Sequence, residues 1–185
     1  MLTRFSRPRD LTAHVMLPPS LVGLAAVSLA VVFLAAVCRA APASAQKPDA
    51  ELKGITVVGV EVEELGSQAA ACGLSRDTIQ AAMSKVLADN GLKVVRNTDT
   101  DVYLYVNVNT VSVPTGLCVS RYDAFLNTHV SARLPYQDQP VLVQVSLLHE
   151  GGLAGGGKAG HAENVVQNLT QYVQQFTSRI RAASQ

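Results

Sequence analysis

The chain has 185 residues, of which 48% are hydrophobic and 16% charged, and its formal net charge is +1 at neutral pH. With a mean hydropathy of +0.21, this composition excludes a disordered or collagen-like chain and lacks the basic excess typical of nucleic-acid binding. The averages combine two unlike segments. Residues 1–45 are the more apolar part and hold four arginines against one aspartate, so the rest of the chain is slightly acidic.

Residues 1–45 show the order of features typical of a secretory signal peptide. Arg4, Arg7 and Arg9 precede a predominantly apolar stretch at residues 21–37, and small residues ending at Ala45 form an A-x-A cleavage pattern. We expect cleavage after Ala45 and a periplasmic or secreted mature protein. The alternative is that residues 21–37 stay in the inner membrane as an anchor, because their length reaches the short end of a spanning helix.

The three cysteines have different expected fates. Cys38 lies between Val37 and Arg39, a context that does not favour lipidation. Removal of the leader leaves Cys72 and Cys118, and an even pair in an oxidising compartment favours one disulfide. Two independent buried thiols are the alternative. Neither cysteine belongs to a C-x-x-C pair, so redox catalysis is not expected.

The first half of the mature chain predicts a strand, a helix and a second strand. Residues 46–53 are polar and predict a flexible lead-in, and β-branched residues at 55–62 predict a strand followed by a loop. Ser75 is a favourable helix N-cap, and apolar residues then recur at helical spacing until Gly91. A short strand at residues 92–95 should follow.

The second half predicts three strands and a closing helix. After turn residues at 97–100, apolar residues alternate with polar ones from 102 to 109, and residues 114–116 predict a hairpin connection. A longer alternation at 119–134 places Arg121, Asn127 and His129 on a solvent-exposed face. A last strand is expected at 141–147, and a helix with one apolar stripe at 165–181.

The element order β-α-β-β-β-β-α predicts one α+β domain over residues 54–185. Two helices with single apolar stripes would cover one face of a mostly antiparallel sheet, giving a two-layer sandwich. The helix AAMSKVLADNGLKVV before DTDVYLYVNVNTV, and the closing VLVQVSLL before YVQQFTSRI, resemble in order the small domains of Gram-negative envelope accessory proteins. Those domains are the N-terminal domain of the Tol-system translocation protein and the lipopolysaccharide-assembly lipoprotein family. Because this resemblance concerns only the order of the elements, it assigns no functional residue to this chain.

A glycine-rich segment has the spacing of a phosphate-binding loop. Gly152 to Lys158 match G-x-x-x-x-G-K, but Ala159 stands where such a loop needs a hydroxyl for magnesium. Nucleotide binding is therefore not expected. Residues 151–160 predict a mobile connector, because so many glycines cost entropy to order. Lys158 remains a candidate for binding an anion or a partner.

Imidazole and carboxylate groups flank the same segment. His149 and His161 are candidate metal ligands beside Glu150 and Glu163, although their spacing matches no closed motif such as H-E-x-x-H. A periplasmic metal-binding protein or a small hydrolase using residues 149–163 is the alternative function. No nucleophile elbow is present, so an enzyme is not the first expectation and no cofactor is expected.

The strand at 102–109 carries the more suggestive surface. Tyr103, Tyr105, Asn107 and Asn109 share its polar face, and amphipathic rings beside amides suit a partner or ligand. The first expectation is therefore an exported, non-catalytic envelope accessory or binding protein. Its partner would be an envelope protein or a small ligand and not a nucleic acid, and it would contact the membrane only through an uncleaved N-terminal segment.

Overall fold

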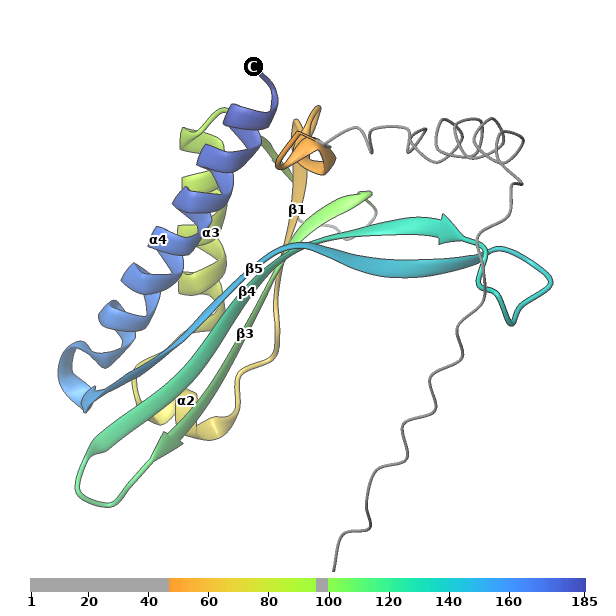
Figure 1. The fold of residues 1–185 in the computed structure, drawn as a ribbon. Helices are drawn as coiled ribbons and strands as arrows, with labels where there is room; N and C mark the ends of the chain where they lie inside the picture. Colours follow the sequence, from red (N-terminus) through yellow and green to blue (C-terminus); the bar gives the residue numbers. More distant parts are fainter. Residues whose placement is uncertain (1–46, 96–99) are drawn as a thin grey trace, which may run out of the picture. The chain divides into compact units, whose positions relative to one another are not determined.

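The computed structural model describes residues 47–95 and 100–185 (Figure 1). The expected signal peptide and most of the turn expected at 97–100 lie outside these residues. No helix in the described part of the chain has the length and apolarity needed to cross a bilayer. The elements in chain order are the 3-10 turn η1 (Ala50–Leu52), β1 (Val57–Val62), α2 (Ser67–Ala71), α3 (Arg76–Asp89), β2 (Lys93–Val95), β3 (Val102–Ser112), β4 (Leu117–Ala132), β5 (Val141–Gly157) and α4 (Lys158–Ala183).

The strands form one mixed sheet in the order β2-β1-β3-β4-β5. β1 pairs in parallel with β2 and β3, over three and four residue pairs. The antiparallel ladders β3–β4 and β4–β5 are longer, with eleven and sixteen pairs. Because α3 connects β1 to β2, those two strands run in the same direction, as in other crossover connections. The predicted α+β class is confirmed.

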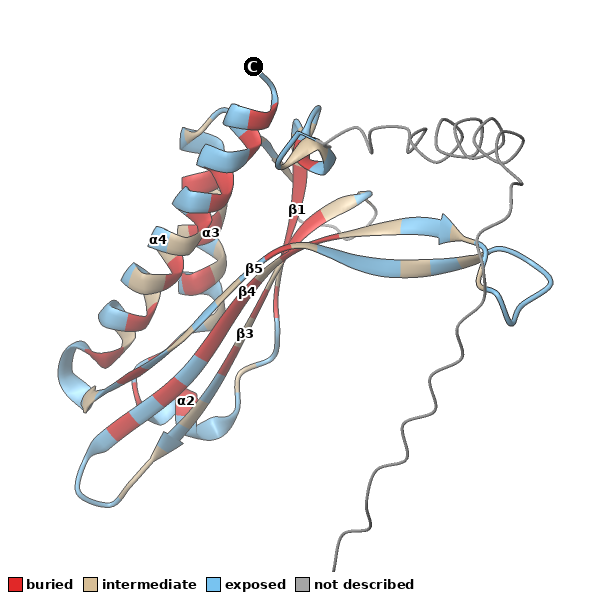
Figure 2. Cartoon of the chain, viewed as in Figure 1, coloured by how far each residue is buried: buried red, intermediate tan, exposed pale blue. Residues whose placement is uncertain are grey.

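Helices α3 and α4 lie side by side on one face of the sheet (Figures 1 and 2). Each presents the apolar stripe expected from its sequence to the even-numbered side chains of β1, β3 and β4, and the buried residues form one core. The two stripes are Ile79, Met83, Val86 and Leu87 of α3, and Val165, Leu169, Val173, Phe176 and Ile180 of α4.

The ends of α3 follow from local chemistry. The Ser75 side chain accepts a hydrogen bond from the Thr78 N–H at 3.4 Å, as expected of an N-cap. At the other end Gly91 has a φ of 86°, and the Leu92 N–H bonds to the Leu87 carbonyl at 3.1 Å. This pair forms a Schellman stop, which requires a residue that tolerates the left-handed conformation.

Two segments are more ordered than their sequences predicted. The lead-in contains η1, and Leu52 is fully buried, so residues 47–53 are held by the core and are not a flexible linker. The loop expected after β1 contains α2, which buries Ala69. Cys72 follows α2 and forms the predicted disulfide with Cys118 of β4, with a Cα–Cα distance of 6.0 Å.

The predicted glycine-rich loop at 151–160 is wrong for most of its length. Residues 151–157 are the last part of β5 and pair with Leu117–Asp123 of β4. Ladder hydrogen bonds join backbones, so a partner strand can hold glycines that would otherwise be mobile. Only residues 159 and 160 form a kink, with Gly160 at a φ of 80°, before the regular part of α4.

Beyond Val102, the first residue of β3, β4 and β5 continue as a two-stranded arm. Residues 129–132 pair there with 141–144, after an irregularity between Leu126 and Asn127, and the arm leaves the helix layer (Figure 1). Val130 and Leu142 on this arm are 41% and 72% exposed. The apolar alternation of β4 therefore runs past the part of the sheet that the helices cover.

Candidate functional site

The sheet face opposite α3 and α4, here called the open face, carries the sequence-predicted tyrosines and asparagines. The even-numbered residues of β3 and the first half of β4 are buried toward the helices, so the odd-numbered side chains point the other way. The register brings together Tyr105 with Phe125, Asn107 with Asp123, and Asn109 with Arg121. β5 adds His149 and Gly151 opposite Phe125 and Asp123.

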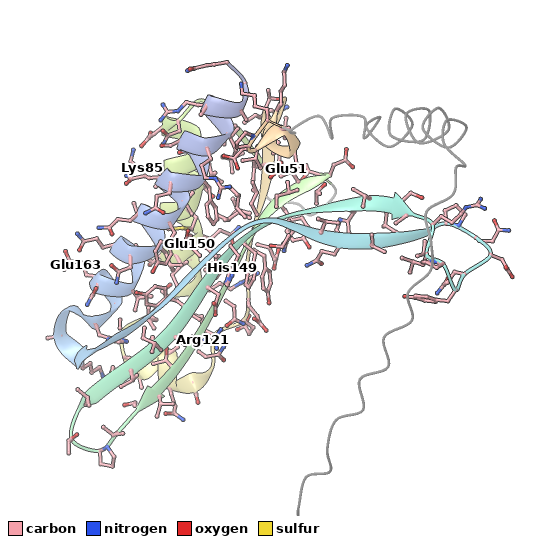
Figure 3. The ribbon with its side chains drawn as sticks, viewed as in Figure 1. Glu51, Lys85, Arg121, His149, Glu150 and Glu163 are labelled. Atoms are coloured by element: carbon pink, nitrogen blue, oxygen red, sulfur yellow. A yellow bond between two sulfur atoms is a disulfide. The ribbon has the colours of Figure 1, made fainter. Side chains whose placement is uncertain are left out.

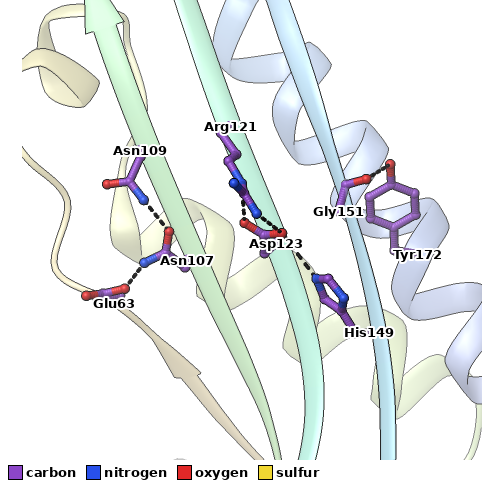
Figure 4. A network of polar contacts seen from close by, with 8 residues as sticks. All are labelled: Glu63, Asn107, Asn109, Arg121, Asp123, His149, Gly151 and Tyr172. Carbon is purple, nitrogen blue, oxygen red and sulfur yellow. Dashed lines mark hydrogen bonds and ion pairs between the residues drawn. The ribbon is translucent and has the colours of Figure 1, made fainter. Parts of the chain in front are cut away.

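One polar group on the open face is centred on Glu63, just after β1. Its carboxylate accepts hydrogen bonds from the Tyr105 hydroxyl at 2.6 Å and from the Asn107 amide, and Asn109 donates in turn to Asn107 (Figure 4). The hydrogen bond to Glu63, followed by burial, raises the pKa of Tyr105 to about 12. The phenol therefore stays protonated and acts as a donor at any physiological pH.

A second polar group surrounds Asp123 in the centre of the sheet. Its side chain is only 10% exposed and contacts Arg121 Nε at 3.1 Å and His149 Nε2 at 3.1 Å. Burial raises the pKa of Asp123, but hydrogen bonds from Arg121 and His149 outweigh it, so the net pKa lies below its ordinary value. The carboxylate is thus ionised and orients both neighbours (Figure 4).

An aromatic surface and a shallow hollow adjoin this second group. The His149 ring stacks on Phe125 with centroids 4.2 Å apart and planes 8° apart. Beside it, a hollow of about 390 Å³ is lined by Arg121, Asp123, His149 and residues 151–153. A ligand in this hollow would meet a guanidinium, an imidazole and bare backbone.

Two glycines of β5 make this arrangement possible. A Cβ at Gly151 would lie 2.3 Å from Asp123 Oδ1, and a Cβ at Gly152 would lie 2.7 Å from the Tyr172 hydroxyl. Gly151 therefore leaves room for the carboxylate on the open face, and Gly152 leaves room for tyrosines on the other. The Tyr172 hydroxyl also donates to the Gly151 carbonyl at 3.3 Å (Figure 4).

Tyr103 is less exposed than the sequence predicted. Its ring stacks on His129 at 5.5 Å and its hydroxyl donates to Gln144 at 2.8 Å, which leaves it 7% exposed. Asn127, also expected to be solvent-exposed, is 2% exposed. Side chains from the base of the arm cover this end of the open face, so Tyr105, Asn107 and Asn109 are the parts of the predicted surface that remain accessible.

The two histidines proposed as metal ligands do not share a site. His149 lies on the open face, whereas His161 begins the regular part of α4 and contacts Ser120 on the helix-covered face, with Nε2 2.8 Å from the Ser120 hydroxyl. Burial lowers the pKa of His161, so it is neutral at physiological pH. Within residues 47–95 and 100–185 no group of three histidine, cysteine or acidic side chains is placed to hold a metal ion.

Lys158 and Glu163 lie away from the polar groups of the open face. Lys158 is exposed, and its backbone N–H donates to the Gly116 carbonyl of the β3–β4 hairpin at 3.1 Å. Glu163 lies on α4 (Figure 3) and lines a separate hollow of about 520 Å³ between α3 and α4. Because residues 152–157 are a paired strand, they do not form the curved cradle of a phosphate-binding loop.

Sequence reasoning did not select Glu63, Asp123 or Phe125. The available signal was the alternation in the strand at 119–134, which placed Arg121 on the polar face and therefore Asp123 and Phe125 beside it. That signal does not say which strand of the sheet is the neighbour. The register supplies this, because it sets Asp123 between Asn107 and Gly151.

No protein-family model and no curated protein matches the chain. Among solved structures, the chain is similar to a PelC dodecamer from Paraburkholderia phytofirmans, with 13% identity and a TM-score of 0.37. The similarity covers 69% of this chain and 86% of the PelC chain. A neuraminyllactose-binding hemagglutinin homolog from Helicobacter pylori is similar to 69% of this chain over 84% of its own, with 10% identity and a TM-score of 0.21.

Proposed function

We propose that this chain is an exported, non-catalytic accessory protein of the cell envelope that binds a partner protein through the open face of its sheet. The observation that carries the proposal is the ordered polar surface formed by Glu63, Tyr105, Asn107, Asp123 and His149 on a face that α3 and α4 leave bare. The buried Asp123 carboxylate and the exposed Glu63 carboxylate are each held by two donors, which gives the surface a fixed shape, as recognition requires.

Two features support export. The N-terminal segment has the basic, apolar and small-residue order of a signal peptide. The Cys72–Cys118 disulfide is typical of proteins that fold in an oxidising compartment. An alkaline phosphatase fusion after residue 185 tests this proposal, because the fused enzyme is active only outside the cytoplasm. An inactive fusion that is produced in full would contradict export.

The chemistry of the open face favours a polar partner of low net charge. Asp123 already pairs with Arg121, whereas Glu63 accepts hydrogen bonds from the uncharged Tyr105 and Asn107 and keeps its charge. The two polar groups therefore carry only a small net charge. Planar amides, an imidazole and ring faces remain to make hydrogen bonds and stacking contacts. A broad sheet face with a shallow hollow suits a protein surface better than an enclosed small molecule.

Site-specific photocrosslinking in living cells tests this function. A photoreactive residue at Asn109, which is exposed beside the polar groups, should yield a defined crosslinked species in the envelope. The same residue at Gln171, exposed on α4, is the matched control and should not yield it. The variant Asp123→Asn should reduce the Asn109 species several-fold, because it weakens the ion pair that fixes the surface.

The outcomes separate the alternatives. Equal crosslinking from Asn109 and Gln171, or none from Asn109, would contradict a binding role for the open face. An Asn109 product heavier than this chain by only the mass of a small molecule would indicate a small ligand in place of a partner protein.

One observation favours a second candidate, a small hydrolase. The Asp123 carboxylate holds His149 Nε2 at 3.1 Å, which leaves Nδ1 free to act as a base. Hydrolysis of envelope esters or amides that is lost in His149→Ala, with the fold unchanged, would establish this candidate and overturn the non-catalytic proposal.

A further inference from the structure

β5 is an edge of the sheet that lacks the usual protection against pairing. Its seventeen residues, Val141–Gly157, have a strand neighbour on one side only within the described residues. They include no lysine, arginine or proline, which are the residues that natural edge strands use to block further pairing. The Gly151 carbonyl accepts the Tyr172 hydroxyl of α4, and beyond this contact the unpaired side of Leu153–Gly157 is open to another strand.

The alternation of hydrogen bonds shows which backbone groups in the glycine-rich part of β5, residues 151–157, face away from β4. The Lys158 N–H bonds to Gly116 beyond the end of the β4–β5 ladder, and hydrogen-bonded pairs alternate along antiparallel strands. Gly152, Ala154 and Gly156 consequently bond to β4. The N–H and C=O groups of Leu153, Gly155 and Gly157 point away from it and have no strand partner in the described structure.

Contacts within the chain do not require the last glycines of β5. A Cβ at Gly155 would meet only a Val119 methyl at 4.0 Å, and a Cβ at Gly156 or Gly157 would meet nothing within 4 Å. Glycine within a strand is less favourable than alanine, because it loses more conformational freedom on folding. Such glycines often mark a place where another backbone approaches closely.

Exposed apolar side chains surround these glycines on the open face. Leu153 is 74% exposed. Val119 and Leu117 are the β4 neighbours of Gly155 and Gly157, and Val111 is the β3 neighbour of Val119; their exposed fractions are 41%, 43% and 57%. A contiguous apolar group at the end of an unpaired strand indicates a protein contact.

We propose that two copies of this chain pair antiparallel through Leu153–Gly157 of β5, about a two-fold axis at Gly155. In this register Leu153 lies opposite the partner subunit's Gly157, which has no side chain. Leu153 can therefore extend toward the partner subunit's Leu117. The same contact is repeated on the other side of the axis, as an isologous dimer requires.

The pattern favours a second copy over an unrelated strand. Identical residues meet at a two-fold axis, and Gly155 has no side chain to clash there. The only large side chain of the segment, Leu153, faces a glycine in both copies. The two ionisable side chains of β5, His149 and Glu150, lie outside the paired segment, so no like charges oppose each other. The inference goes beyond the proposed function and does not depend on it.

Cysteine crosslinking of the full-length chain in cells tests both the dimer and its register. All variants carry Cys38→Ser to remove the leader thiol. Hydrogen-bonded residues across antiparallel strands have Cα atoms about 5.5 Å apart, a distance that allows a disulfide. Gly155→Cys should therefore give a dimer on non-reducing gels, roughly tenfold or more above Leu142→Cys, an exposed control on the same strand.

The register gives a second, independent readout. Leu153→Cys alone and Gly157→Cys alone should crosslink weakly, because identical residues would lie about 13 Å apart along the strands. When the two variants are produced together, a heterodimer should form. In each variant the Cys72–Cys118 disulfide, measured by alkylation and mass spectrometry, reports that the fold is intact.

Three results would overturn the proposal. One is no dimer from Gly155→Cys in protein whose native disulfide is present. The second is equal dimer from Gly155→Cys and Leu142→Cys, which would indicate random collision. The third is a crosslink from Gly155→Cys to a different protein in place of a second copy, which would assign the edge to another partner.

Discussion

Replacing Gly151 with alanine tests whether the contacts of Asp123 with Arg121 and His149 depend on the absence of a side chain at this position of β5. The new Cβ would lie 2.3 Å from Asp123 Oδ1 and 3.3 Å from the Tyr122 carbonyl oxygen. Backbone cannot move far inside a paired ladder, so the carboxylate must move away from Arg121 and His149. The substitution should therefore destabilise the domain and disturb the open face together.

The size of the destabilisation follows from the hydrogen bonds of Asp123 that the substitution would weaken. Hydrogen bonds to charged groups contribute about 1.5–3 kcal/mol when buried. Arg121 and His149 side chains are 68% and 47% exposed, so solvent screening reduces each to about 1 kcal/mol or less. Displacing a mostly buried carboxylate adds strain. We expect Gly151→Ala to lower the free energy of unfolding by about 1–3 kcal/mol.

Gly156→Ala is the matched control on the same strand. A Cβ at Gly156 meets nothing within 4 Å, so alanine should be neutral or stabilise by up to about 1 kcal/mol through the unfolded state. Urea unfolding followed by circular dichroism gives both values. Equal stability of the two variants would show that Gly151 is not needed to accommodate Asp123, and the reasoning about the open face would fail.

Three further predictions concern other parts of the domain. Replacing Cys72 and Cys118 together with alanine should cost about 4 kcal/mol in thermal or urea unfolding, because the disulfide closes a loop with a sequence separation of 46; a loss below 1 kcal/mol would contradict this. Because the pKa of Asp123 is lowered on folding, its ionised form stabilises the fold above the unfolded pKa, and this contribution disappears as pH falls through the folded value. The stability difference between wild type and Asp123→Asn should thus shrink as the pH falls below about 4, and a difference that grew in this acid range would refute the sign. Glu63→Gln should lower the pKa of Tyr105 from about 12 toward 10 in an NMR titration, and an unchanged value would exclude Glu63 as the cause.

The helices show how far local sequence reasoning extends. Ser75, the apolar stripe and Gly91 define α3 without reference to any other element, because caps and periodicity act within one or two turns. The same is true of the alternation in β3, which placed Tyr105 and Asn107 on one face. The short helix α2 was missed because its stability comes from burying Ala69 and from the disulfide that follows it.

The glycine-rich half of β5 shows the opposite case. Glycine has poor strand propensity, so the sequence predicted a mobile loop at 151–160. The partner strand β4 reverses that result through backbone hydrogen bonds, and the tight space around Gly151 and Gly152 makes glycine necessary there. A prediction made from the pattern of side chains cannot identify a position at which the fold requires that no side chain be present.

The sequence by itself determined the α+β class, the limits of α3 and the polar face of β3, because each depends on local periodicity or capping. It favoured the pairing of Cys72 with Cys118 through the cysteine count, and the structure confirmed that pairing. Only the tertiary structure decided that His149 joins Asp123 while His161 joins Ser120 across the sheet. Strand order and register bring together residues far apart in the chain, and no local pattern encodes them. The open face and the free edge of β5 are consequences of that packing.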